Sequence, residues 1–258
     1  KEDAKRHGVS ILNPEINHSA AKCVIEEGAL RLGFLNITSI GPAMADIILH
    51  QRQNGGAFIS IADFMERTSI PVESLQSLTD AGAFDLMQPN RRAVRWEIGL
   101  RHRSIGQQLA LSMSITQDMT ELPPLTDWDK MEGEYKSMHL HPSEHVMTYA
   151  RNQLRPGISP TRDVWGMKNG SKVAVAGLVI RRQRPAGQAI FLTLEDEYGH
   201  ASFIIWPAVY KRLRHILKEP FLVVRGTVSR REGTMNVVVQ QAEILEVLAA
   251  PPPSKNWR

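Results

Sequence analysis

The feature that most constrains the fold is a change in hydrophobic period close to residue 172. Before this point apolar residues recur at the helical spacing of three and four, and beyond it apolar and polar residues alternate, as in strands. Five strands are predicted, at residues 173–181, 189–195, 201–206, 221–229 and 235–244. Between the third and fourth strands a helix is predicted, with an apolar stripe of Val209, Leu213, Ile216 and Leu217. Three strands, one helix and two strands is the order of elements in an OB-fold, a five-stranded barrel.

The segment 36–105 is predicted to be helical and to contain two helix–hairpin–helix units. In the first unit, a tight turn at Ser39-Ile40-Gly41-Pro42-Ala43 opens a helix. A glycine lets backbone come close to a phosphate, and a helix N-terminus offers amide groups to it. The usual first glycine is Ser39 here, and a position that often holds a basic residue is Ala43. The second unit, residues 72–84, turns at Ala81-Gly82-Ala83. The alternative is that either hairpin merely joins two packed helices, because a glycine turn alone is weak evidence.

The predicted fold class is α+β, with five regions along the chain. Residues 1–35 contain a small β-hairpin and are expected to be the edge of an upstream domain. Residues 36–105 form the tandem helix–hairpin–helix region, and residues 106–170 are a linker with helices near 127–137 and 143–154. The OB-fold spans 171–248. The tail, 249–258, contains Pro251-Pro252-Pro253 and is expected to be disordered.

Charge is concentrated in the barrel segment. The whole chain carries a formal charge of only +4, but residues 172–231 hold eleven Lys and Arg against four Asp and Glu. A basic domain suits a polyanion, and a solvated surface can have the same composition.

Five arginines lie in the two loops that flank the binding face of an OB-fold. They are Arg181, Arg182 and Arg184 between the first two strands, and Arg230 and Arg231 between the last two. We expect both groups to reach the same face and to contact phosphates.

Aromatic residues on the second and third strands supply surfaces on which bases could stack. Phe191 and Trp206 are the predicted stacking residues, and Phe203 lies on the same strands. The alternative for Phe191 and Phe203 is the barrel core. In the helical region the predicted DNA contacts are Ser39, Gly41, Ala43, Gly82, Arg91 and Arg92.

The sequence contains no convincing catalytic or metal site, and no cofactor is predicted. The spacing of His139, His141 and His145 resembles that of three metal-binding histidines. However, Pro142 divides them, and no Asp or Cys follows at the spacing of a further ligand. A surface or capping role is the preferred interpretation. Glu195-Asp196-Glu197, followed by Gly199, is interpreted as an acidic β-turn. The single Cys23 excludes an internal disulfide and fits a reducing cytoplasm. No apolar run has the length to span a membrane.

One short motif points to a protein partner. Gln108-Leu109-Ala110-Leu111-Ser112 resembles the clamp-binding peptide of bacterial polymerases, with Gln108, Leu109 and Leu111 at the matching positions. Ser112 replaces the aromatic residue that supplies much of the burial in the clamp pocket. The match is therefore degenerate, and an ordinary linker is the preferred interpretation.

Several stretches resemble the C-terminal third of bacterial error-prone DNA polymerases, which are alternative C-family polymerase III alpha subunits. They include Ala81-Gly82-Ala83-Phe84-Asp85, and the most specific are Arg182-Gln183-Arg184-Pro185 and Leu194-Glu195-Asp196-Glu197. The resemblance implies a DNA-directed polymerase of damage-induced mutagenesis and translesion synthesis, with its aspartates and Mg²⁺ in an upstream palm. This chain would then grip duplex backbone and single-stranded template. The implied partners are DNA, mutagenesis accessory proteins and the sliding clamp.

Two alternatives come from other classes. In the first, the helices and barrel are a protein-docking module that recruits accessory proteins or the clamp. In the second, the barrel is the tRNA-binding OB module of a synthetase, although the helical hairpin ahead of it argues against this.

Overall fold

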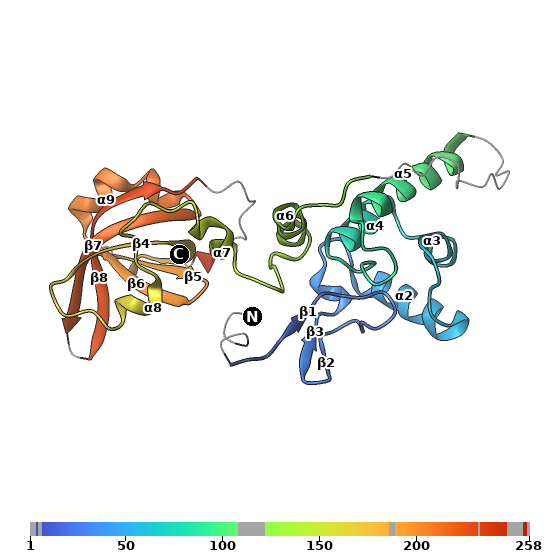
Figure 1. Cartoon of the computed structure of the whole chain (residues 1–258), viewed down its shortest axis with the longest axis horizontal. Helices are drawn as coiled ribbons and strands as arrows, with labels where there is room; N and C mark the ends of the chain where they lie inside the picture. The colour runs from blue at the N-terminus through green and yellow to red at the C-terminus, as the bar shows by residue number, and fades with distance from the viewer. Residues whose placement is uncertain are drawn as a thin grey trace. The chain divides into compact units, whose positions relative to one another are not determined.

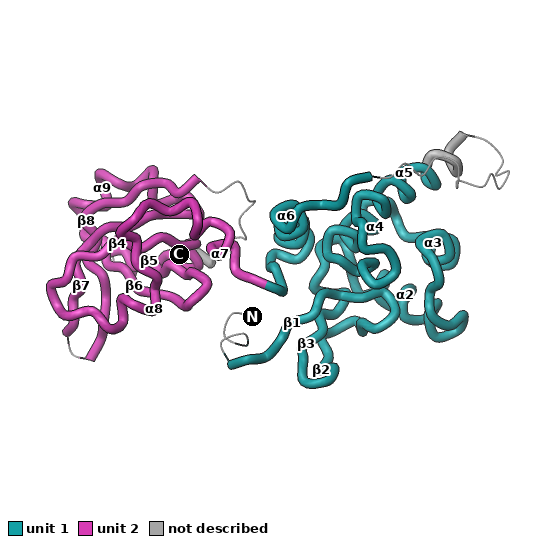
Figure 2. The backbone as a smooth tube through the Cα atoms, in the orientation of Figure 1, with its two compact units in different colours: residues 1–143 teal, residues 144–258 magenta. Residues whose placement is uncertain are grey.

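The chain divides into two units, Lys1–Ser143 and Glu144–Arg258, which are coloured separately in Figure 2. The computed structural model describes residues 4, 7–107, 122–185, 189–231, 233–246 and 255–256. Each unit has its own hydrophobic core.

The first unit combines a small sheet with a group of helices (Figure 1). Its strands are β1 (Ile11–Leu12), β2 (Val24–Glu26) and β3 (Ala29–Arg31), and β2 and β3 form the predicted hairpin. β1 adds a parallel partner to β3. The helices are η1 (Phe34–Asn36), α2 (Pro42–Gly55), α3 (Ile61–Thr68), α4 (Val72–Asp80), α5 (Arg91–Gln107) and α6 (Asp127–Met138).

Residues from both the β-hairpin region and the helices form the core of the first unit. Phe64 lies at its centre, with edge-to-face contacts to Phe58 and Phe84 at centroid distances of 4.9 and 5.2 Å. Ile16 and Phe34 are fully buried in the same core. The predicted boundary at residue 35 is therefore not a domain boundary, because the β-hairpin region and the helices share one core.

The helix boundaries follow local signals in the sequence. Ser60 caps α3 by accepting a hydrogen bond from the Asp63 N–H at 3.1 Å, and Ser60-Ile61-Ala62-Asp63 has the sequence pattern of such a helix start. The chain leaves α3 at Ser69, which has a left-handed φ of 50°. On α2 the buried positions are Ala45 and Ile48, while Ile47 is 44% exposed, so only a narrow side of this helix faces the core.

A buried arginine joins four parts of the first unit. Arg91, at the start of α5, is only 3% exposed. Its guanidinium donates to Asp85 and to Glu134 on α6, each at 2.7 Å, and to the Asp80 carbonyl at 2.8 Å. Asn13 completes the cluster by donating to Glu134 at 2.8 Å.

The acidic partner of Arg91 is itself tightly held. A hydrogen bond of 2.6 Å joins Glu134 Oε2 to Nδ1 of the buried His141. Burial alone raises the pKa of Glu134, but the hydrogen bond from His141 and the charge of Arg91 outweigh it, so the pKa is lowered from its ordinary 4.5. Glu134 is therefore ionised inside the unit, and its charge is balanced by Arg91.

Removal of Arg91 is expected to destabilise the first unit strongly. Arg91→Ala leaves Glu134 buried without its cation, and breaking a buried pair in this way costs about 3–5 kcal/mol. The neighbouring Arg92→Ala is the matched control, because Arg92 is exposed and 3.5 Å from Asp129, and such pairs contribute about 0–1 kcal/mol. Urea unfolding of both variants measures the difference. Equal stability of the two would contradict the structural role of Arg91.

Because the pKa of Glu134 is lowered, the stability that this side chain contributes should be lost at acid pH. A group whose pKa is lowered on folding contributes stability above its unfolded pKa and loses it as the pH falls through the folded pKa. Glu134→Gln should therefore be less stable than the wild type at neutral pH. The difference in stability between the wild type and Glu134→Gln should become smaller as the pH falls below about 4.5, the ordinary pKa of a glutamate. Thermal unfolding across this range measures the difference, and a difference that stays constant to low pH would show that ionised Glu134 adds no stability.

The second unit is a closed barrel preceded by two short helices, α7 (Val146–Arg151) and α8 (Thr161–Val164). Its strands are β4 (Lys172–Gln183), β5 (Ile190–Asp196), β6 (Gly199–Ile205), β7 (Phe221–Arg231) and β8 (Thr234–Ile244). The hydrogen-bonded order is β5-β6-β8-β7-β4, and a pairing of β4 with β5 closes the barrel. α9 (Pro207–Leu213) and η4 (Ile216–Lys218) lie between β6 and β7. The predicted α+β fold with an OB-type barrel is confirmed.

Close packing of strands explains two glycines of the barrel. A Cβ on Gly226 would lie 2.2 Å from the Val238 carbonyl oxygen, and one on Gly177 would lie 2.7 Å from that of Glu195. Gly226 follows a shift of register between β7 and β8, a β-bulge that tightens the bend of the strand. Both positions exclude a side chain.

Two segments differ from the prediction. The linker assigned to 106–170 is divided in the structure, because α6 belongs to the first unit, and α7 and α8 belong to the second. In the tail, Lys255–Asn256 form β9, which pairs in parallel with β4 at Arg181 and Arg182. These two tail residues are thus part of a strand rather than disordered.

Candidate nucleic-acid interface

The first hairpin presents the N-terminus of α2 at the surface. Ser39, Gly41 and Ala43 are all exposed. Gly41 is the N-cap residue of α2, and the first turn of the helix contains no acidic residue. The first N–H groups of a helix have no acceptor within the helix, and they carry the positive end of its dipole. The geometry is suited to an anion.

The left-handed residue of this turn is Ser39, with a φ of 67°, and Gly41 has an ordinary φ of −86°. The turn therefore does not need glycine at position 41 for its conformation. A Cβ on Gly41 would meet nothing within 4 Å. The absence of a side chain leaves the helix N-terminus open to approach.

The hairpin is held from behind by two other helices. The Thr38 N–H donates to the Ser137 carbonyl on α6 at 2.7 Å. The Ser74 hydroxyl on α4 donates to the Ser39 carbonyl at 3.3 Å. Ile40, between them, is 5% exposed and belongs to the core. The exposed tip is thus part of a fixed framework.

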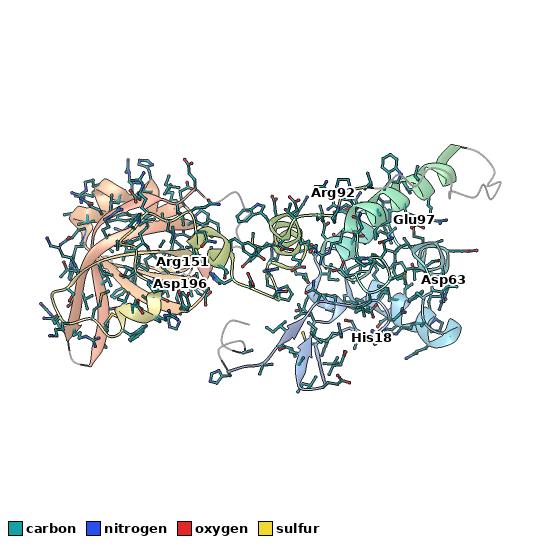
Figure 3. All side chains as sticks on the ribbon, viewed as in Figure 1. His18, Asp63, Arg92, Glu97, Arg151 and Asp196 are labelled. Atoms are coloured by element: carbon teal, nitrogen blue, oxygen red, sulfur yellow. The ribbon has the colours of Figure 1, made fainter. Side chains whose placement is uncertain are left out.

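The second hairpin does not reach the surface, and this corrects the prediction for Gly82 and Arg91. Gly82 is buried, with a φ of 82°. A Cβ there would lie 2.4 Å from Nη2 of Arg91 and 2.6 Å from Nδ2 of Asn13. Gly82 provides room for the buried arginine cluster. Arg92 points outward beside it (Figure 3).

In the barrel, the arginines of the first loop separate into different roles. Arg182 binds the protein itself. Its guanidinium donates to the carbonyls of Leu217 at 2.9 Å, Lys218 at 2.9 Å and Glu219 at 2.7 Å. These carbonyls close the η4 turn, so Arg182 acts as its cap. Arg181 and Arg184 are exposed.

The arginines of the other loop divide in the same way. Arg230 donates to the carbonyls of Met167, at 2.9 Å, and Trp165. Arg231 is exposed. Arg182 is therefore structural, which corrects its assignment as a phosphate contact, whereas Arg230 binds two carbonyls and is still exposed at the surface.

The two arginine groups lie at opposite ends of the ladder between β4 and β7. β4 and β7 are antiparallel, with Lys172 opposite Thr227 and Leu178 opposite Phe221. Arg181–Arg184 lie at the far end of β4, and Arg230–Arg231 lie at the far end of β7. Because the strands run in opposite directions, the two groups are at opposite ends of the shared ladder.

The aromatic residues also separate. Phe203 is fully buried in the barrel core. Phe191 is half-buried and alternates with the buried Leu192, so its ring lies on the outer side of the barrel, beside Ile204 on β6. Trp206, at the start of α9, is 51% exposed. Phe191 and Trp206 thus remain available on the surface.

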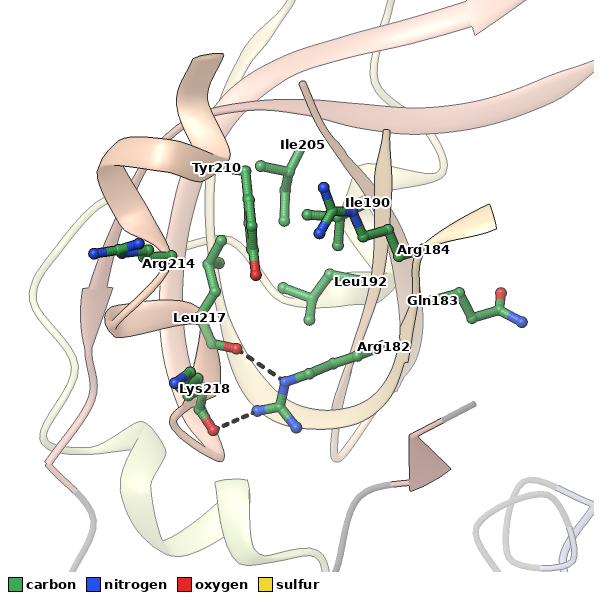
Figure 4. Close-up of a pocket in the computed structure, with 10 residues that line it drawn as sticks. All are labelled: Arg182, Gln183, Arg184, Ile190, Leu192, Ile205, Tyr210, Arg214, Leu217 and Lys218. Atoms are coloured by element: carbon green, nitrogen blue, oxygen red, sulfur yellow. Dashed lines mark hydrogen bonds between the residues drawn. The ribbon is translucent and has the colours of Figure 1, made fainter. Parts of the chain in front are cut away.

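A basic rim around a cavity was missed from the sequence. The cavity, of about 360 Å³, lies between the end of β4 and the α9–η4 segment (Figure 4). Arg184, Arg214 and Lys218 are exposed residues that line it, and Tyr210 stands beside them. Arg214 and Lys218 flank the predicted apolar stripe in the sequence, so the sequence could have indicated these two cations. Their position opposite the first loop depends on the closed barrel.

The three histidines have separate structural roles. His145 is the N-cap of α7, where its Nδ1 accepts a hydrogen bond from the Met147 N–H at 3.1 Å. His139 is exposed at the end of α6, and His141 pairs with Glu134. Among the described residues, no group of three or more His, Cys, Asp or Glu could hold a metal ion.

The acidic turn anchors α7 to the barrel. Asp196 is 1% exposed and accepts from the N–H groups of Thr161 at 2.8 Å and Tyr198 at 3.0 Å. Arg151 donates to Asp196 at 2.9 Å and to Glu197 at 2.7 Å (Figure 3). The interpretation of this segment as a structural turn is confirmed, and its partner Arg151 was missed.

Two predictions fall elsewhere. Gln108, Leu109 and Leu111, the predicted clamp-binding residues, lie outside the described residues. None of the helices in the described part of the chain is long and apolar enough to cross a membrane.

Each unit contains a segment that matches a family model. Residues 8–94 match the helix-hairpin-helix motif family, and residues 173–245 match the OB-fold nucleic acid binding domain family. Among solved structures, asparaginyl-tRNA synthetase from Pyrococcus horikoshii is 24% identical over 37% of this chain and 24% of that chain. Its TM-score of 0.33 is too low to bear on function.

Curated relatives extend over nearly the whole chain. The error-prone DNA polymerase of Mesorhizobium japonicum is 31% identical over 94% of this chain and 24% of its own length. That of Mycolicibacterium paratuberculosis is 29% identical over 93% of this chain and 22% of its own length. The chain therefore spans about a quarter of the length of these relatives. The resemblance to error-prone DNA polymerases is confirmed, and the chain belongs by homology to that family.

Because Arg182 binds backbone carbonyls and Arg181 is exposed, replacing each by alanine should have different effects on stability. Arg182→Ala removes the donor to three carbonyls, and we expect a loss of about 2 kcal/mol, in the range for hydrogen bonds made by a charged group. Arg181→Ala is the matched control and should change stability by less than about 0.5 kcal/mol, as for a surface substitution. Thermal unfolding of both variants measures this. A destabilised Arg181→Ala with an unaffected Arg182→Ala would reverse the assignment.

Proposed function

We propose that this chain is the DNA-handling part of an error-prone DNA polymerase. The first unit grips the backbone of duplex DNA at the hairpin Ser39–Ala43. The second unit binds single-stranded template through the basic rim and the exposed aromatics of the barrel. The observation that carries the proposal is the open N-terminus of α2, exposed at Gly41 and fixed from behind by α4 and α6.

The chemistry of the hairpin supports a backbone contact without base specificity. Exposed N–H groups at a helix N-terminus bind phosphate oxygens, and these contacts carry no sequence information. Neither Ser39 nor Ala43 has a side chain that could make the bidentate hydrogen bonds by which Arg, Asn or Gln identify a base in the major groove. A polymerase needs such a contact, because it must hold any sequence.

In the barrel, the proposed contacts are Arg181, Arg184 and Arg231, with Phe191 and Trp206 as stacking surfaces. Exposed cations and outward aromatics are the two components of non-specific single-strand binding. Arg92 is the proposed additional duplex contact on the first unit.

For the whole protein, the proposal is DNA-directed DNA synthesis during damage-induced mutagenesis and translesion synthesis, in the cytoplasm. It rests on the names of the relatives and on the resemblance in sequence. Catalytic aspartates and Mg²⁺ belong, on this proposal, to a palm outside this chain. Mutagenesis accessory proteins and the sliding clamp are the proposed protein partners.

A charge placed at the hairpin tests the duplex contact. Gly41→Glu has room for its side chain, since nothing lies within 4 Å of the added Cβ. A carboxylate at a helix N-terminus also favours the helix. We therefore expect a stable variant that binds duplex DNA about tenfold more weakly, because the carboxylate repels the phosphate. Fluorescence anisotropy with a labelled duplex measures the affinity.

The control carries the same change of charge at the other end of α2. Gln53→Glu is exposed and roughly 18 Å along the helix from Gly41, which is beyond the screening length of about 8 Å at physiological salt. It should bind duplex DNA like the wild type, and oligo(dT) affinity should be unchanged in both variants. Equal duplex affinity of Gly41→Glu and wild type would exclude the hairpin contact.

Salt separates DNA binding from the docking alternative. Wild-type affinity for duplex should fall as salt rises, by about 0.9 log units per log unit of salt for each phosphate neutralised. An affinity that does not respond to salt would favour protein docking.

A further inference from the structure

The cavity at the end of the barrel combines an apolar floor with a cationic rim. Ile190, Leu192 and Ile205 form the floor, and Leu192 is 1% exposed and Ile205 fully buried. The rim carries Arg184, Arg214 and Lys218, and none of the described residues that line the cavity is acidic. Its volume of about 360 Å³ falls within the usual range for small-ligand sites. The occupant should therefore have an apolar, planar or compact body and a negative group.

Tyr210 and Arg184 make the site suited to a nucleobase. Cζ of Arg184 lies 5.4 Å from the centroid of the Tyr210 ring, at the mouth of the cavity. Figure 4 shows the tyrosine ring and the Arg184 guanidinium on facing sides above Leu192. Bases stack on aromatic rings and on guanidinium planes, and both surfaces are present here.

One wall of the cavity is held rigidly. Arg182 fixes the η4 turn through the carbonyls of Leu217 and Lys218, both drawn in Figure 4. Because the turn is fixed, Lys218 stays at the rim. A site whose walls are already in place loses less entropy when a ligand binds.

We propose that this cavity binds a single nucleoside monophosphate unit. The base stacks on the Tyr210 ring above the apolar floor, in place of the exposed Arg184 guanidinium, and the phosphate lies among Arg184, Arg214 and Lys218. The unit is one nucleotide of the bound single strand, which rests on the proposed function, or a free nucleotide. An acidic peptide is the competing occupant, but it offers no planar group for Tyr210 and Arg184.

The experiment uses the full chain labelled with ¹⁵N and follows amide chemical shifts in NMR spectra. The probes are deoxyadenosine monophosphate, deoxyadenosine, inorganic phosphate and a glutamate-rich peptide, each titrated separately. We expect the monophosphate to shift amides of residues 182–184, 190–192 and 210–218, and to bind more tightly than deoxyadenosine or phosphate. Equal or tighter binding of the peptide at these amides would overturn the proposal.

Two variants remove the proposed contacts. Arg184→Ala removes an exposed cation, and Tyr210→Leu keeps an apolar side chain but loses the stacking surface. Each should weaken binding of the monophosphate about tenfold. Lys168→Ala, which removes an exposed cation that does not line the cavity, is the control and should bind like the wild type. If Arg184→Ala, which does not touch the core, also binds like the wild type, the proposal is wrong.

Oligo(dT) binding separates this inference from the proposed function. If the chain binds oligo(dT) and neither pocket variant weakens it, and no pocket amide shifts with any nucleotide, the cavity proposal fails while strand binding stands. If deoxyadenosine monophosphate binds the cavity but oligo(dT) does not bind the chain, the proposal holds for free nucleotide and the proposed strand-binding function fails.

Discussion

The ion pair between Arg91 and Glu134 is the contact on which the first unit depends. It joins α5 to α6, with 2.7 Å between Nη2 and Oε1, inside a unit where both side chains are almost fully buried. α6 in turn accepts the Thr38 N–H through Ser137, directly behind the exposed hairpin. The buried charges therefore position the surface that is proposed to meet DNA. Loss of the pair would move α6, and the hairpin would lose its support.

The sequence predicted the elements better than the roles of its arginines. Alternation of apolar residues and the capping signal at Ser60 depend on local geometry, so strands and helix starts could be found from the chain alone. Whether an arginine contacts solvent depends on which carbonyls and carboxylates fold beside it. Arg91, Arg182 and Arg230 all bind protein groups, and the last two bind carbonyls that come from distant segments. No local pattern could reveal these partners.

The glycines show the same limit. Gly82 lies in the predicted turn, just after the end of α4, and its positive φ follows from that position. Its second property, the room that it leaves for the Arg91 guanidinium, depends on tertiary packing. At the first hairpin, the sequence motif located the turn, and the structure shows that its left-handed residue is Ser39 rather than Gly41.

Strand geometry explains why neighbouring arginines have different roles. Side chains alternate across a strand, so Arg182 and Arg184 lie on one side of the end of β4, and Arg181 lies on the other. Arg182 meets the carbonyls of the η4 turn first and is used to cap them. Arg184 is one step further along the same side, beyond the turn, and lines the mouth of the cavity. Arg181 lies opposite Thr193, on the outer side that carries Phe191. A single basic run in sequence thus supplies a structural cap, a cavity rim and an outer surface, and only the last two are available to a polyanion.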